Sequence, residues 1–96
     1  DTTADLLAVC GATGEGSEAA ILACRAFIEA TVQYHDAVSD RKNLKRLICY
    51  PQSATIADGR TAFLAWGEAN SGNAERMNEL PVVGLVRALA EKYPCK

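Results

Sequence analysis

The sequence has little from which an enzyme site could be built. It contains one histidine, His35, and none of its four cysteines stands in a CxxC pair. Zinc sites need cysteine and histidine ligands at short local spacing, so this pattern argues against zinc. The Gly-rich stretch 11–16 follows no predicted strand and precedes no Gly-Lys-Ser/Thr, which argues against a phosphate-binding loop. We therefore expect no metal, no cofactor and no catalytic residue.

Long apolar runs and a strong net charge are also missing. The longest apolar segment is far too short to span a bilayer, so we expect no membrane insertion. The net charge of −2 argues against a nucleic-acid partner. One basic cluster follows Asp40 and is interrupted by Asn43 and Leu44, and we interpret it as a solvated face rather than a phosphate-binding patch. Its members are Arg41, Lys42, Lys45 and Arg46.

The cysteines indicate a disulfide framework, because an even number in a chain of 96 residues is typical of small secreted domains. Four free thiols in a cytosolic protein are the alternative. Sequence alone permits three pairings. We favour Cys10–Cys24, which would close a short Gly-rich loop, with Cys49–Cys95, which would tie the chain end to its middle. An oxidising compartment follows, and since the chain starts at Asp1, we expect a mature form whose signal peptide was removed.

Hydrophobic periodicity predicts a single all-α domain over residues 1–96, a compact bundle of about four helices stapled by two disulfides. Alternation typical of strands is absent. The second helix carries an apolar stripe that includes Ile28 and Val32, and the last helix carries one that includes Leu85 and Leu89. The predicted helices are residues 3–9, 17–38, 56–68 and 81–92.

Single residues refine this prediction. Ser17 is a good N-cap for the second helix, and Thr55 with Asp58 resembles a capping box for the third. We expect Trp66 to anchor the core and His35 to be a structural or surface residue. A turn of helix is also expected around residues 44–48, before Pro51.

A polar connection separates the last two predicted helices. We expect a surface turn at residues 70–73 and loop or frayed helix over the remainder, up to Glu79. By composition alone, a polar connection of this length is equally well explained as a functional loop or as slack.

Several motifs resemble, in order and over nearly the whole chain, the Rap/Tai family of immunity proteins. These proteins protect bacteria against peptidoglycan amidase effectors of the type VI secretion system. The resemblance begins with Cys10 and with Cys24 followed by Phe27-Ile28. It continues through Ile48-Cys49-Tyr50-Pro51, Phe63-Leu64-Ala65-Trp66, the run from Pro81 to Leu89, and Tyr93-Pro94-Cys95.

The resemblance implies a periplasmic helical protein, often a homodimer, that plugs the active-site cleft of an amidase. The amidase itself uses a Cys/His pair for catalysis. In the family a protruding loop between the last helices enters that cleft. The corresponding stretch here, residues 68–79, departs from the shorter His-Pro-containing connection of the commoner pattern. Carboxylates of this loop would mimic those of the peptide substrate, and its amides and hydroxyl would bind the catalytic side chains. The expected partner-binding residues are Glu68, Asn70, Ser71, Asn73, Glu75, Arg76, Met77 and Glu79.

Two other functions stay open at this level. A periplasmic acid-stress chaperone of the disulfide-bonded helical type would expose apolar surface below about pH 3, when its carboxylates become neutral. A carrier of a small ligand would need an apolar cavity, for which the chain offers only two phenylalanines and one tryptophan.

Overall fold

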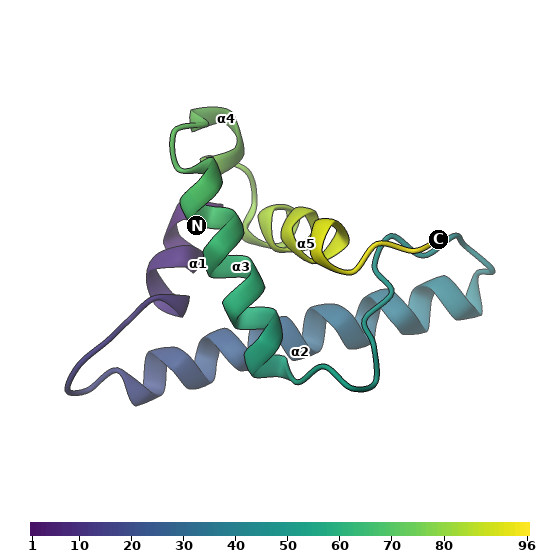
Figure 1. Ribbon diagram of the computed structural model, residues 1–96, viewed down its shortest axis with the longest axis horizontal. Coiled ribbons are helices and arrows are strands. Elements are labelled where there is room, and N and C mark those ends of the chain that lie inside the picture. The colour runs from purple at the N-terminus through teal and green to yellow at the C-terminus, as the bar shows by residue number, and fades with distance from the viewer.

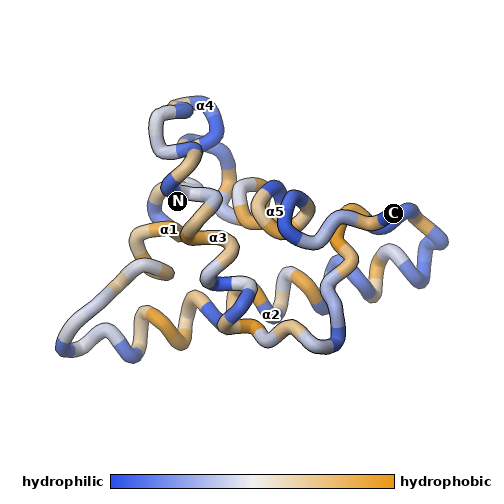
Figure 2. Tube along the Cα trace, viewed as in Figure 1, coloured by the Kyte–Doolittle hydropathy of each residue, from blue (hydrophilic) through white to orange (hydrophobic).

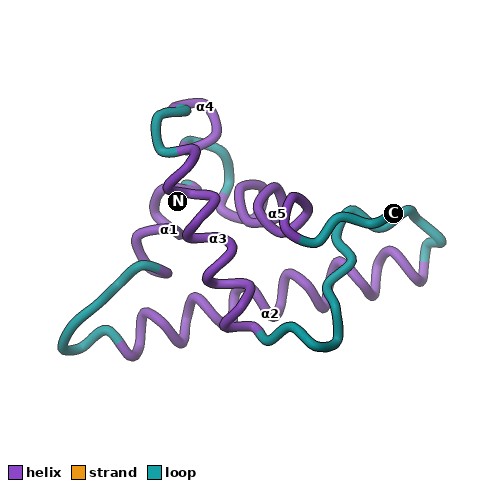
Figure 3. The backbone as a smooth tube through the Cα atoms, in the orientation of Figure 1, coloured by secondary structure: helices purple, strands orange, loops and turns teal.

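A computed structural model describes all residues, 1–96, and consists of helices and loops without a strand (Figure 3). The all-α prediction is confirmed: four helices have eight residues or more, and a fifth is a single turn. None of them combines the length and the apolar character that crossing a membrane would require. The helices are α1 (Thr3–Cys10), α2 (Glu18–Arg41), α3 (Ile56–Asn70), α4 (Ala74–Met77) and α5 (Pro81–Lys92).

The long helix α2 forms the base of the molecule, and α1, α3 and α5 pack together on one side of it (Figure 1). Their shared core contains Ile28 from α2, Phe63 from α3 and Leu85 from α5, all of which are fully buried. Trp66 is 6% exposed and packs beside Phe63, so its predicted role as a core anchor is confirmed. The apolar stripes of the sequence therefore meet in one core.

Local capping explains where most helices begin. The side chain of Thr2 accepts a hydrogen bond from the amide of Asp5, whose carboxylate accepts one from the Thr2 amide. Thr55 and Asp58 form the same reciprocal box at α3, as predicted. Ser17 occupies the N-cap position of α2, but its side chain makes no capping hydrogen bond, which corrects the expectation for it.

Both disulfides of the favoured pairing are present, Cys10–Cys24 and Cys49–Cys95, and no cysteine is free. The first lies in the core, since both of its residues are fully buried. The second lies near the surface, where it joins the segment before α3 to the segment after α5. One bridge thus fixes the loop between α1 and α2, and the other fastens the chain end to the α2–α3 connection.

The predicted turn of helix at residues 44–48 is wrong. That stretch forms neither helix nor strand, and its buried residue is Ile48. The amides of Leu47 and Ile48 donate to Nε2 of His35, at 3.1 and 3.2 Å, instead of to carbonyls one turn earlier. A hydrogen-bond acceptor on another element has replaced the helical pattern there. Helices α2 and α3 also extend beyond their predicted ends, to Arg41 and Asn70.

Glycine allows the closest helix contact. A Cβ atom at Gly84 of α5 would overlap the side chain of Thr3 on α1, so only glycine fits there. Thr3 is fully buried at this contact. The start of α1 is therefore pressed against α5 beside the segment that leads into α5.

Candidate functional site

The predicted binding stretch forms a projection, which we define as residues 68–80. It comprises the end of α3, the single turn α4 and the segment leading into α5, and it stands away from α2 (Figure 1). The chain around α4 is mostly hydrophilic (Figure 2). The structure thus brings all eight predicted partner-binding residues together in one protruding element.

The short helix α4 is stabilised by two asparagines that precede it, Asn70 and Asn73. The Asn73 side chain accepts a hydrogen bond from the Arg76 amide at 3.1 Å and so caps α4. Asn70 donates to the Trp66 carbonyl at 2.8 Å and accepts from the Arg76 guanidinium at 2.7 Å. The turn is therefore ordered by its own side chains and attached to the last turn of α3.

The base of the projection is fixed by residues distant in sequence. The amide of Thr3 donates to the Glu79 carbonyl at 2.8 Å, and its hydroxyl lies 3.1 Å from the carbonyls of both Glu79 and Leu80. The Glu79 carboxylate accepts two hydrogen bonds from Arg87, at 2.7 and 2.8 Å. These contacts hold the projection against α1 and α5, which lowers the ordering cost of binding a partner.

Charge pairing also affects the titration of Glu79. The hydrogen bond from Arg87, together with the positive charges of Arg87 and Arg76, lowers the pKa of Glu79 below its ordinary value. Its carboxylate is engaged within the chain and so differs from the free carboxylates of Glu68 and Glu75, which are exposed and form no salt bridge.

The predicted residues therefore divide into two sets. The inner set is half-buried and consists of Asn70, Arg76, Met77 and Glu79. Met77 packs against the core, and the other three form hydrogen bonds that hold the projection together. The outer set is exposed to solvent: Glu68, Ser71, Asn73 and Glu75.

Within the outer set, Ser71 donates to the Glu68 carbonyl and Asn73 caps α4. The carboxylates of Glu68 and Glu75 have no salt-bridge partner in the chain. Leu80, the last residue of the projection, is 65% exposed.

Sequence reasoning missed Thr3 and Arg87, the two residues that fix the base of the projection. The partners of Thr3 lie 76 and 77 residues further along the chain. No local pattern could have identified that contact.

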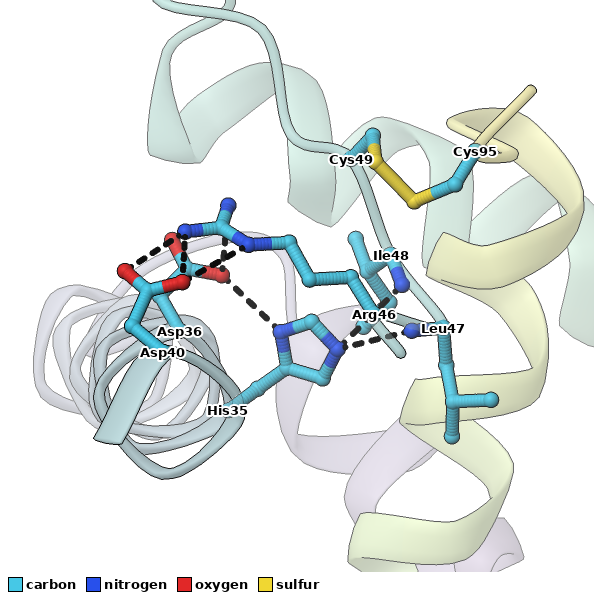
Figure 4. The surroundings of a disulfide bond; sticks show 8 residues. All are labelled: His35, Asp36, Asp40, Arg46, Leu47, Ile48, Cys49 and Cys95. Atoms are coloured by element: carbon cyan, nitrogen blue, oxygen red, sulfur yellow. Dashed lines mark hydrogen bonds and ion pairs between the residues drawn. A yellow bond between two sulfur atoms is a disulfide. The ribbon is translucent and has the colours of Figure 1, made fainter. Parts of the chain in front are cut away.

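The other long connection, residues 42–55, is also ordered by side chains. His35 accepts the two amides of the Leu47-Ile48 segment through Nε2, so its proton resides on Nδ1, 2.9 Å from the Asp36 carboxylate (Figure 4). Arg46 donates to both carboxylate oxygens of Asp40 at 2.9 Å. His35 is thus a structural residue, as expected.

Arg46 and His35 thus both have partners within the chain. The hydrogen bond from Arg46 to Asp40 raises the pKa of the guanidinium. No group of three or more His, Cys, Asp or Glu side chains is arranged to hold a metal ion. The projection is therefore the best candidate for a functional site, and its chemistry is that of a binding surface.

Comparison with known proteins identifies a matching family. The family model of the Rap1a immunity proteins matches residues 2–95. No curated protein and no solved structure matches the chain significantly. The match extends from α1 to the second disulfide and includes the projection.

Proposed function

The chain belongs to the Rap1a immunity protein family, and from this premise we propose that it binds a type VI secretion peptidoglycan amidase and inhibits it by plugging the active-site cleft. The producing cell or its kin would thereby be protected. The family match favours this function over an acid-stress chaperone and over a carrier of a small ligand.

The observation that carries the proposal is the ordered projection with two unpaired carboxylates. Glu68 and Glu75 are exposed and unpaired, whereas Glu79 is held by Arg87. A cleft that accepts a peptide bearing carboxylates would present donors to these two groups. Because the inner residues order the turn before binding, little conformational entropy is lost when it enters a cleft.

The place of action proposed is the periplasm. Disulfides persist in oxidising compartments, and both bridges of this chain are formed. The periplasm is also where an amidase meets peptidoglycan. The homodimer that the family resemblance implies is part of the same proposal, and the outer residues of the projection would stay free of the dimer contact.

The experiment begins by purifying the amidase that the wild-type protein retains from the periplasm of the producing cell. Cleavage of isolated peptidoglycan by that amidase is then measured with and without the immunity protein. The double variant Glu68→Lys, Glu75→Lys is expected to inhibit at least about 100-fold less well, since each opposed charge contact costs several kcal/mol.

The matched control is Glu15→Lys, Glu18→Lys, which makes the same charge change in the exposed α1–α2 loop and at the start of α2. It should inhibit as the wild type does. Equal inhibition by both double variants would exclude the projection as the plug, and absence of any retained amidase would remove the proposed effector class.

A further inference from the structure

The far end of α2 and the start of the loop after it carry exposed leucines among cations. We call residues 41–47 the tip, and it lies at one end of the long axis of the molecule, away from α4 (Figure 1). Leu44 is 57% exposed and Leu47 is 63% exposed. A solvated face accounts for the cations of the tip, but it does not explain the two leucines beside them. The cations are Arg41, Lys42, Lys45 and Arg46.

The first leucine is fixed in place where α2 ends. The amide of Leu44 donates to the Ser39 carbonyl at 2.8 Å. The amide of Asn43 donates to the Asp40 carbonyl at 3.3 Å, and Asn43 has a φ of 54°. This is a Schellman motif, in which an apolar residue at the position of Leu44 usually packs back on the helix. Here more than half of the leucine stays exposed, so the motif presents it to solvent.

The second leucine is held by its own backbone. The Leu47 amide donates to Nε2 of His35 at 3.1 Å, and the next residue, Ile48, is fully buried. The side chain of Leu47 nevertheless stays exposed and points away from His35 (Figure 4). Both leucines are therefore positioned before a partner binds, which lowers the ordering cost of binding.

Three of the four cations of the tip have no carboxylate partner. The guanidinium of Arg46 lies 2.9 Å from Asp40 and 3.5 Å from Asp36, so its charge is balanced within the chain. The other three are exposed and form no salt bridge: Arg41, Lys42 and Lys45. The tip therefore combines positive charge with apolar side chains, although the whole chain has a net charge of −2.

We propose that the tip docks on the surface of an anionic phospholipid bilayer, without spanning it. Each Lys or Arg that comes close to such a surface strengthens binding about fivefold, because it is attracted to the negatively charged headgroups. The two leucines are stabilised at the same time, because they enter the boundary between headgroups and acyl chains. The surface is thus complementary to the tip both in charge and in polarity.

The size and composition of the tip favour a bilayer over other anionic partners. A specific contact with another protein would bury about 800 Å² on each side, which is more than the end of one helix and a short loop provides. A nucleic acid would bind the cations through its phosphates but would leave the leucines in water. A bilayer binds both kinds of side chain.

This inference goes beyond the proposed function, because the tip shares no residue with the projection. The two lie apart in the molecule, so a docked chain would keep the projection in solution, where an effector can reach it (Figure 1). Loss of docking would leave inhibition measurable in solution, and loss of inhibition would leave docking measurable on vesicles.

The first test is flotation of the purified, oxidised protein with lipid vesicles at low salt. Wild type is expected to bind vesicles of phosphatidylcholine and phosphatidylglycerol at least about tenfold more tightly than vesicles of phosphatidylcholine alone. Lys45→Glu should weaken binding to the anionic vesicles at least about tenfold, because it replaces an attraction with a repulsion. A wild type that binds neither kind of vesicle, or binds both equally, overturns the proposal.

The matched control is Arg25→Glu, which makes the same change of charge at an exposed position without a salt bridge. Arg25 is also on α2 and lies about 24 Å along the helix from Arg41, at 1.5 Å per residue. It should bind the anionic vesicles as the wild type does. If Arg25→Glu and Lys45→Glu weaken binding equally, only the overall charge matters and the tip is not the docking site. Circular dichroism melts show whether each variant folds.

The second test separates a bilayer from a soluble polyanion. Leu44→Asn keeps the amide that donates to Ser39 but removes the apolar side chain. It should weaken binding to the anionic vesicles about fivefold, because the leucine no longer leaves water. Leu22→Asn, at a leucine of α2 that is 69% exposed, should bind as the wild type does. If Lys45→Glu weakens binding and Leu44→Asn does not, the contact is purely electrostatic and the bilayer is overturned as the partner.

Discussion

The two long connections of this protein, residues 42–55 and the projection, are both ordered but by different means. The first uses a disulfide, a buried side chain and the imidazole of His35. The projection has no disulfide and is held by carbonyl contacts to Thr3 and by its inner side chains. As a result, the outer face of the projection retains free carboxylates. The difference shows how a connection can be rigid and still present groups to a partner.

The largest expected effect is loss of the bridge that fastens the first connection. The double variant Cys49→Ser, Cys95→Ser opens a loop with a sequence separation of 46 residues. Chain entropy then lowers the free energy of unfolding by about 4 kcal/mol. Urea unfolding followed by circular dichroism measures the loss. Inhibition by the folded fraction should be unchanged, and impaired inhibition would show that the two connections depend on each other.

Ile48 in the first connection and Leu80 in the projection give the next comparison. Ile48 is fully buried and Leu80 is 65% exposed. We expect Ile48→Ala to lower the free energy of unfolding by about 2–4 kcal/mol, because it leaves a cavity. Leu80→Ala should change it by less than about 0.5 kcal/mol. Similar losses for the two variants in urea unfolding would contradict the contrast between the connections.

Thr3→Val tests how the projection is held. Valine keeps the shape of the side chain but removes the hydroxyl that contacts two carbonyls at 3.1 Å. The expected loss of unfolding free energy is about 1 kcal/mol. Amide hydrogen exchange in the projection should become faster, while exchange at Leu47 and Ile48 stays unchanged. Unaltered exchange throughout would show that the hydroxyl does not order the projection.

The smallest effect concerns pH. Arg87 lowers the pKa of Glu79 from an ordinary value of 4.5, so the ionised form is favoured in the folded state. The stability that this pair contributes is present above pH 4.5 and is lost as the pH falls through the lowered pKa of the folded state. Unfolding free energies of wild type and Glu79→Gln should therefore converge as the solution is acidified below this value. A constant difference between them would contradict the role of the ion pair.

Which structural features could be predicted from the sequence depended on how far apart in the sequence the contacting residues lie. The capping box of Thr55 and Asp58 and the position of Pro81 at the start of α5 were predictable, because their partners lie within one helical turn. The eight loop residues were placed in one element by the resemblance. Their division into an inner and an outer set was not predictable, because it depends on Arg87 and on Thr3 at the other end of the chain.

By itself the sequence determined the helical class, the apolar stripes that form the core and the cysteines that staple it, since these follow from periodicity and local chemistry. That residues 44–48 form no helix followed only from the tertiary structure, because only the packed chain brings His35 to the amides of Leu47 and Ile48. It also decided that Glu79 is bound while Glu75 is free. Hydrogen-bond partners far apart in sequence meet only after the helices have packed, and no local pattern encodes them.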